Sequence, residues 1–278
     1  MTWEKKRVLV TVKTYPEKSR KYGTIVCTVG LTEEGEWIRL YPIPLKFYNG
    51  KDKIKKFDWI EVECQKNDHE KLGRKESCKV RADSIKIVDR SLSGKPGRRV
   101  DWNKRSELLM QHVSPSLEYL QEQYRKDKTS IGMIKPRKVI DFIKNQDLQI
   151  YDTPFRCQTA LDGSQTPVTE DIPHIFQYLF RCNGCDDDKE HKIQCEDWEL
   201  LESYRRWGLR YKDTGILWEK LHQKYYTDMI EKKDLYFFMG MYSLQPTWLI
   251  IGLYYPPKNG IKVKDDKDKN VDLFKFGD

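Results

Sequence analysis

The sequence has no uninterrupted apolar run of the roughly eighteen residues from which a membrane-spanning helix is recognised. Its first residues, Met-Thr-Trp-Glu-Lys-Lys-Arg, lead directly into a strand-like segment and lack the apolar core of a secretory signal. Hydrophobic residues make up 38% of the 278 residues and charged residues 34%, which is typical of a protein that stays in water. We therefore expect a cytoplasmic protein that does not enter a membrane.

Common catalytic signatures are also missing. No glycine-rich phosphate loop joins a predicted strand to a helix, no G-x-S-x-G motif occurs, and the five histidines form no H-x-x-x-H pair. These absences favour a protein that is not an enzyme. A metal-dependent nuclease or nucleotide hydrolase stays open as an alternative, with Asp58, Glu61 and Glu63 as its carboxylates. Against it, Glu63 and Lys66 are three positions apart, which places them on opposite faces of a strand.

The chain has seven cysteines, an odd number, so reduced thiols and metal binding are favoured over disulfides. Three cysteines and one histidine lie close together in the pattern C-x2-C-x5-H-x3-C, formed by Cys182, Cys185, His191 and Cys195. Thiolate and imidazole ligands at such spacing are typical of tetrahedral Zn²⁺, and the glycine between the first two cysteines allows the required tight turn. The segment 182–195 is therefore predicted to form a closed structural zinc site.

Several alternatives for this segment stay open. The four residues could be ordinary thiols and a histidine in a turn, and Cys157 could replace Cys195 or His191 as a ligand. Retroviral zinc knuckles, which bind single-stranded nucleic acid, have the similar spacing C-x2-C-x4-H-x4-C. Here the surroundings are acidic and would repel phosphates, with Asp186, Asp187, Asp188, Glu190, Glu196, Asp197, Glu199 and Glu202 against Lys189 and Lys192. This acidic zinc segment is an alternative docking site for a basic protein partner.

Strand-like segments fill the first ninety residues. They alternate polar with β-branched or aromatic residues at 6–13, 23–31, 36–44, 57–66 and 78–89. No helical periodicity interrupts them, which predicts a small β-barrel of the OB or SH3 type. The fold class is thus α+β, with an OB-like barrel in residues 1–100 and a mixed α+β domain with the zinc site in residues 101–278.

Positive charge is concentrated in the front part of the chain. The net charge is +8, and residues 1–25 carry seven lysines and arginines against two glutamates. Residues 91–105 form a second basic stretch, which has the glycine, proline and serine content of an exposed linker. A basic front half indicates a polyanionic partner, although a lysine-rich soluble surface would give the same count.

The third strand-like segment adds aromatic residues to this charge. Alternation places Trp37, Arg39 and Tyr41 on one face, where an arginine between two rings can stack bases and neutralise phosphates. The alternative is that Trp37 and Tyr41 pack beneath a later helix with Arg39 as their polar lid. With residues of the neighbouring loops, the predicted nucleic-acid surface comprises Tyr15, Arg20, Lys21, Tyr22, Trp37, Arg39, Tyr41, Lys46, Arg98 and Arg99.

The stretches S-R-K-Y-G-T-I-V-C-T-V-G-L and E-W-I-R-L-Y-P-I-P resemble the head of a group of uncharacterised bacterial and archaeal proteins. More remotely, this head is similar to dual OB-domain proteins through Cys27, Gly30, Trp37, Ile38 and Arg39. The resemblance implies a role in an antiviral defence or mobile-element system. The leading prediction is a non-enzymatic protein that binds single-stranded DNA or RNA and Zn²⁺, and a protein-interaction subunit is a further alternative.

Overall fold

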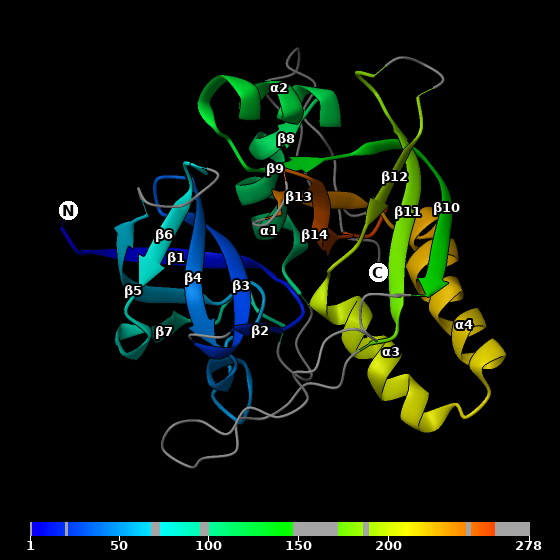
Figure 1. The fold of residues 1–278 in the computed structure, drawn as a ribbon, viewed down its shortest axis with the longest axis horizontal. Helices are drawn as coiled ribbons and strands as arrows, with labels where there is room; N and C mark the ends of the chain where they lie inside the picture. The colour runs from blue at the N-terminus through cyan, green and yellow to red at the C-terminus, as the bar shows by residue number, and fades with distance from the viewer. Residues whose placement is uncertain are drawn as a thin grey trace.

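The protein consists of an N-terminal β-barrel and a following region of mixed helices and sheets (Figure 1). This arrangement confirms the predicted α+β class with a small barrel at the front. Within the described ranges, no helix is both long and apolar enough to cross a membrane. The structure is a computed structural model, and it describes residues 2–19, 22–67, 73–94, 100–146, 172–185, 189–242 and 246–258.

Five strands close the barrel, in the spatial order β1 (Glu4–Lys13), β3 (Gly23–Thr32), β4 (Trp37–Pro44), β6 (Ser77–Val80) and β5 (Trp59–Lys66). The ring closes because β1 pairs with both β3 and β5, and only the β4–β6 pair within the ring is parallel. This closed five-stranded sheet is the predicted OB-like barrel. Shorter elements extend or connect it: β2 (Glu17–Ser19), β7 (Lys86–Asp89), and the 3-10 turns η1 (Leu45–Tyr48) and η2 (Ala82–Ser84).

Alternation along the strands fills the barrel interior. Val8 from β1 and Ile38 and Leu40 from β4 are buried there, and each fully buried aliphatic side chain contributes about 1.5–3 kcal/mol. A side chain at Gly30 in β3 would collide with the backbone oxygen of Leu9. Only glycine therefore allows β1 and β3 to approach this closely.

The second region contains two sheets. One has four strands in the order β14 (Trp248–Tyr254), β13 (Tyr236–Met241), β9 (Ile131–Ile134) and β8 (Val113–Ser114), and the other has three in the order β10 (Pro136–Gln146), β11 (His174–Cys182) and β12 (His191–Gln194). A parallel bridge between Cys195 and Ile250 connects the end of β12 to β14. The two sheets thereby share one hydrophobic core.

Helices flank these sheets, with α3 and α4 beside β10 and β11 and with α2 next to β8 and β9 (Figure 1). Asp197 begins α3 and Ser116 begins α2, because each side chain accepts hydrogen bonds from backbone amides of the first turn. The helical elements are α1 (Trp102–Leu109), η3 (Met110–His112), α2 (Leu117–Asp127), α3 (Trp198–Arg210), α4 (Thr214–His222), the π-helical turn η5 (Gln223–Thr227) and α5 (Asp228–Glu231).

Buried polar contacts fix the barrel against the second region. The ammonium group of Lys56, from the barrel, lies 2.9 Å from the carboxylate of Asp197. Thr14, just after β1, forms an antiparallel bridge with the same aspartate. On the other side, the Glu76 carboxylate accepts a hydrogen bond of 2.9 Å from the Ser130 amide. Because these groups are buried, the relative position of the two regions is specified by hydrogen bonds as well as by apolar packing.

Candidate metal centre and nucleic-acid surface

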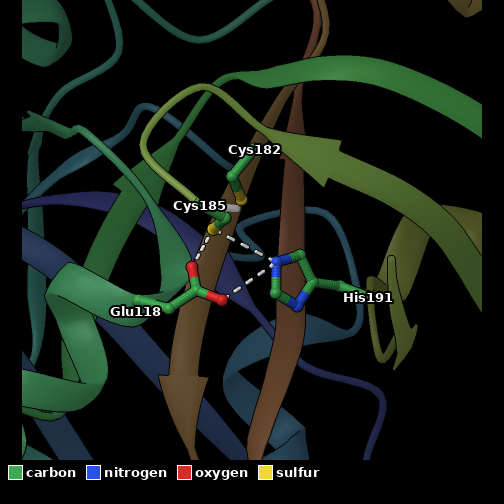
Figure 2. Close-up of side chains that lie close together, drawn as sticks. All are labelled: Glu118, Cys182, Cys185 and His191. Carbon is green, nitrogen blue, oxygen red and sulfur yellow. Dashed lines mark hydrogen bonds and ion pairs between the residues drawn. The ribbon is translucent and has the colours of Figure 1, made fainter. Parts of the chain in front are cut away.

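Four side chains with metal-binding atoms meet beside the first turn of α2 (Figure 2). Glu118 comes from α2, Cys182 ends β11, Cys185 lies in the following turn, and His191 begins β12. One ligand atom from each residue lies within 4.8 Å of the other three. A carboxylate, two thiols and an imidazole at this separation can all reach a single ion.

Two separations within this group match those of ligands around a tetrahedral ion. The Sγ atom of Cys185 lies 3.3 Å from Nε2 of His191 and is in hydrogen-bond contact with Glu118. The same Nε2 atom is 3.4 Å from Oε1 of Glu118. Metal–ligand bonds of about 2.0–2.3 Å place tetrahedral ligands roughly 3.3–3.8 Å apart. The donor set and the two distances from Nε2 of His191 therefore fit Zn²⁺.

Local packing explains why the group forms. In the hairpin of β11 and β12, Phe180 is the register partner of His191, which fixes the position of the imidazole. A β-carbon on Gly184 would lie 3.3 Å from the β-carbon of Ser116, the residue that caps α2. The absence of a side chain at Gly184 thus lets the cysteine turn approach the start of α2, where Glu118 is located.

The electrostatics of the group suit a cation. Burial lowers the pKa of His191, which favours the neutral imidazole that metals bind. Burial opposes ionisation of Glu118, but hydrogen bonds from Lys189 and from a backbone amide, together with the charges of His191 and Lys189, lower the pKa of the carboxyl. Burial raises the pKa of the Cys182 thiol, so thiolate formation there depends on the metal.

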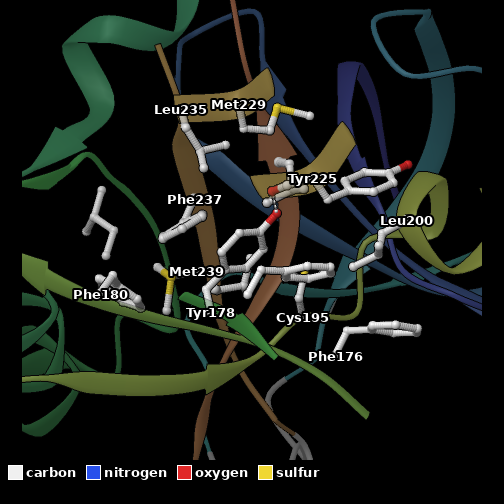
Figure 3. Close-up of a cluster of buried hydrophobic side chains, with 14 of the residues drawn as sticks. Phe176, Tyr178, Phe180, Cys195, Leu200, Tyr225, Met229, Leu235, Phe237 and Met239 are labelled. Atoms are coloured by element: carbon white, nitrogen blue, oxygen red, sulfur yellow. Dashed lines mark hydrogen bonds between the residues drawn. The ribbon is translucent and has the colours of Figure 1, made fainter. Parts of the chain in front are cut away.

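Cys195 does not join this group but lies in the hydrophobic core beside Tyr178 and Leu200 (Figure 3). The residue is 1% exposed, and burial raises the pKa of its thiol well above the usual value. The fourth side chain of the group is that of Glu118, where the sequence pattern has Cys195. Cys157, the alternative ligand, lies outside the described residues.

The predicted nucleic-acid residues fall into exposed and buried groups. Tyr22 and Tyr41 are 40% and 38% exposed, and their rings meet edge to face with centroids 6.1 Å apart. Lys46 is also exposed, and its nearest carboxylate, that of Asp83, is 3.9 Å away. Four further predicted residues lie outside the described part of the chain: Arg20, Lys21, Arg98 and Arg99.

Arg39 is buried between the two regions. Its guanidinium donates hydrogen bonds to the backbone oxygen of Ser130 at 3.2 Å and to the sulfur of Cys27 at 3.4 Å. Strand alternation identifies the face on which Arg39 lies, but the second region covers that face. A buried guanidinium cannot reach a phosphate, so Arg39 is left out of the surface proposed below.

Two predicted aromatic residues lie at the same contact. The ring of Trp37 packs against His112 and Phe238, with centroids 5.3 and 6.0 Å away. The ring of Tyr15 packs against Trp198 at 6.2 Å. Both side chains are half-buried and pack between the barrel and the second region. The alternative interpretation is therefore right that Trp37 is covered, but η3 and β13 cover it instead of a long helix, and Tyr41 stays exposed.

The carboxylates considered for catalysis do not form a common centre. Asp58 is fully buried and accepts a hydrogen bond of 2.8 Å from the Lys55 amide. Each carboxylate has its own cation: Asp58 with Arg90, Glu61 with Lys5, and Glu63 with Arg81. Among the residues that the structure describes, the one group able to hold a metal is that of Glu118.

Two family models together cover most of the chain. The domain of unknown function DUF8758 matches residues 4–111, and the domain of unknown function DUF8757 matches residues 113–275. The chain belongs to the DUF8757 family. The metal-binding group lies within the DUF8757 match, whereas the barrel lies within the DUF8758 match. Two domains of unknown function agree with the predicted membership of an uncharacterised group.

No curated protein matches this DUF8757 member. Among solved structures it is similar to a chain described as "Structure of murine DNA binding protein bound with ds DNA". The match covers 95% of this chain and 100% of the murine chain, with 10% sequence identity and a TM-score of 0.33. A likeness at that score does not establish a shared fold.

Proposed function

We propose that this protein binds single-stranded DNA or RNA on the outer face of its barrel, without cleaving it. The observation that carries the proposal is the exposed ring pair of Tyr22 and Tyr41. Tyr22 ends the loop between the first two barrel strands, β1 and β3, and Tyr41 lies on the third, β4. OB-folds bind oligonucleotides with this loop and with the face of their second and third strands.

Charge at this surface supports the proposal. Lys79 is exposed and is the register partner of Tyr41 in the β4–β6 pair, and Lys46 is exposed just beyond β4. The sequence places Arg20 and Lys21 immediately before Tyr22. Aromatic platforms flanked by cations are what single-strand binding requires, because the rings stack bases and the cations neutralise phosphates.

The test is a titration of labelled oligonucleotides. Fluorescence anisotropy with single-stranded DNA, single-stranded RNA and duplex DNA, each at several salt concentrations, measures preference and charge contribution together. We expect tighter binding of single strands and a log–log salt slope of about −0.7 for each phosphate neutralised. Equal binding of single strands and duplex, or intact binding with no salt dependence, contradicts the proposal.

We also propose that Glu118, Cys182, Cys185 and His191 hold a structural Zn²⁺. All four tetrahedral positions would be filled by protein atoms, which is typical of structural sites, whereas catalytic zinc keeps an open position. The metal would join α2 to the hairpin of β11 and β12. Metal analysis of the purified chain tests the assignment, and less than one zinc per two chains after purification without chelator opposes it.

Other parts of the interpretation remain predictions. The division into a barrel of residues 1–100 and an α+β part of residues 101–278 is proposed as the functional division of the chain. Three further proposals are supported by the sequence alone. They are a basic protein partner at the acidic zinc segment, a cytoplasmic location, and a role in defence or mobile-element systems. In the described residues, no observation favours the nuclease or hydrolase alternative.

A further inference from the structure

A pocket of about 310 Å³ opens between the barrel and the second region. It lies among β1, the segment before β5, the helices α1 and α3, and the end of β14. This volume is at the lower end of the roughly 300–1,000 Å³ found for small-molecule sites. The pocket is separate from the metal-binding group and from the ring pair of Tyr22 and Tyr41, none of which lines it.

Positive charge dominates the lining. Four cationic side chains face the pocket, those of Lys13, Lys55, Lys56 and Arg105, against the one lining carboxylate of Glu199. That carboxylate is already engaged, because it lies 3.5 Å from the Lys56 ammonium group. Among the described residues, Lys13, Lys55 and Arg105 have no carboxylate within ion-pair distance.

Two of the three uncompensated cations, Arg105 and Lys13, are held in place by their surroundings. The Arg105 guanidinium donates two hydrogen bonds to the backbone oxygen of Leu92 and is 7% exposed. Its central carbon lies 3.8 Å from the centroid of the Phe57 ring. The Lys13 ammonium group lies 4.6 Å from the centroid of the Trp198 ring. Burial lowers the pKa of Lys13 to about 8, which shows that its charge is incompletely solvated.

Flat aromatic side chains form the remaining wall. Trp102, at the start of α1, packs against Tyr255 and Tyr254 with ring centroids 6.2 and 5.7 Å away. All three rings line the pocket beside the cations. Aromatic walls next to lysine and arginine offer a stacking surface for a planar ring and charge-assisted hydrogen bonds for an anion attached to it.

We propose that this pocket binds a nucleoside phosphate, with its phosphate between Lys13, Lys55 and Arg105 and its base against Trp102. A phosphate monoester carries up to two negative charges, which suits three uncompensated cations better than a single carboxylate does. The ligand is either a free nucleotide or the phosphorylated end of a strand, and only the second source rests on the nucleic-acid binding proposed above.

Isothermal titration calorimetry tests the proposal with AMP, inorganic phosphate, and a matched oligonucleotide pair carrying a 5′-phosphate or a 5′-hydroxyl. We expect AMP to bind at least ten times more tightly than inorganic phosphate. The variants Lys13→Gln and Lys55→Gln should each weaken AMP binding by about 10-fold, because a charged hydrogen bond is lost. The matched control Lys5→Gln changes an exposed lysine at the other end of β1 and should leave AMP binding unchanged.

The oligonucleotide pair distinguishes the two sources. Tighter binding of the 5′-phosphate, lost in Lys13→Gln, assigns the pocket to strand ends, whereas equal binding of both oligonucleotides with intact AMP binding assigns it to free nucleotides. The double variant Tyr22→Ala/Tyr41→Ala should weaken oligonucleotide binding and leave AMP binding unchanged. The two measurements therefore show separately whether the proposed barrel surface or the proposed pocket is wrong. No AMP binding at millimolar concentration by the folded protein, or binding equal to that of inorganic phosphate, overturns the proposal.

Discussion

The Lys56 ammonium group and the Asp197 carboxylate lie 2.9 Å apart, with side chains only 8% and 1% exposed. Asp197 also accepts hydrogen bonds from the amides of Glu199 and Leu200 in the first turn of α3, and from the amide of Leu253 in β14. One carboxylate therefore joins the barrel, a helix and the four-stranded sheet. Burial opposes the charge on Lys56, but the negative charges of Asp197 and Glu199 together outweigh it and raise the pKa of the ammonium group.

Replacing Asp197 by Asn should destabilise the protein strongly. The amide keeps the size of the side chain and can still accept hydrogen bonds, but it leaves the buried Lys56 ammonium group without its nearest counter-charge. Removing one partner of a buried pair costs about 3–5 kcal/mol. Urea denaturation of Asp197→Asn and wild type should show this loss in the free energy of unfolding.

The matched control for this experiment is an exposed pair. Lys232 and Asp228 lie 2.7 Å apart at i,i+4 spacing on the surface. The variant Lys232→Gln should lose no more than about 0.5 kcal/mol, because exposed helical pairs contribute little. If Asp197→Asn changes the free energy of unfolding as little as Lys232→Gln does, the buried pair does not hold the two regions together.

The barrel could be predicted from the sequence because its signal is local. Each strand alternates β-branched with polar residues over a stretch of a few residues, and polar loops separate the strands. The burial of Arg39 could not be predicted in the same way. Alternation assigns it to the outer face of β4, but Ser130, which covers it, is distant in the sequence.

A second prediction concerns the metal ligands. Glu118→Gln and Cys185→Ser should each reduce the zinc bound per chain and lower its affinity by at least 10-fold, since each removes an anionic ligand. Zinc content is measured by mass spectrometry, and affinity by competition with a chromogenic chelator. Chelation of wild-type protein should also lower its unfolding temperature, because the metal stabilises only the folded chain.

The matched control for the metal site is Cys195→Ala. Cys195 belongs to the same sequence motif but lies in the core, so the variant should keep its zinc while losing some packing free energy. If Cys195→Ala loses the metal and Glu118→Gln keeps it, the ligand set in the sequence motif is right and the set in the structure is wrong.

Three of the four side chains that meet in the candidate metal site could be predicted from spacing, and the fourth could not. Cys182, Cys185 and His191 belong to one hairpin, so their proximity in sequence becomes proximity in space. Glu118 reaches the site only because α2 packs against that hairpin, a contact between distant segments. Cys195 has the chemistry and the spacing of a ligand, and only the direction of the chain after β12 removes it from the group.

The pocket could not be predicted from the sequence either, because it forms between segments that are distant in the chain. Its lining comes from β1, the segment before β5, α1, α3 and β14, which no single motif connects. The sequence predicts an exposed basic linker over residues 91–105, and the structure instead buries Leu92 and Arg105. Composition alone cannot distinguish a solvated arginine from one packed on an aromatic ring.

A third prediction concerns the ring pair on the barrel. Changing Tyr22 and Tyr41 together to Ala should weaken single-strand binding by about 10- to 100-fold, because stacking contributes roughly 1–3 kcal/mol per base. The salt slope should stay the same, since no phosphate contact is removed. Tyr119→Ala, a tyrosine 41% exposed on α2, is the matched control and should bind as wild type. Equal affinity of the double variant and this control would remove the rings from the binding surface.

The last prediction follows from the lowered pKa of Lys13. Burial is the main cause that lowers the pKa of Lys13 to about 8, and the nearby positive charges of Lys56 and Lys53 add to it. The negative charges of Glu199 and Asp197 oppose the shift. The pKa of a lysine in an unfolded chain is about 10.4. Between these values the unfolded chain binds more protons than the folded chain, so this group makes stability rise with pH across that window.

Lys13→Met removes this titration, so its free energy of unfolding relative to wild type should be highest below pH 8 and fall as the pH approaches 10. Urea denaturation in phosphate-free buffer at pH 7, 8, 9 and 10 measures this trend. Phosphate is excluded because an anion bound in the pocket would itself stabilise the charged lysine. Lys5→Met, on the same strand with an exposed side chain, reports what losing a surface charge does over the same range. The Lys5→Met result is subtracted from the difference in free energy of unfolding between Lys13→Met and wild type. If the remaining difference stays constant or grows with pH, the Lys13 charge is fully solvated. The pocket would then hold no uncompensated cation at that position.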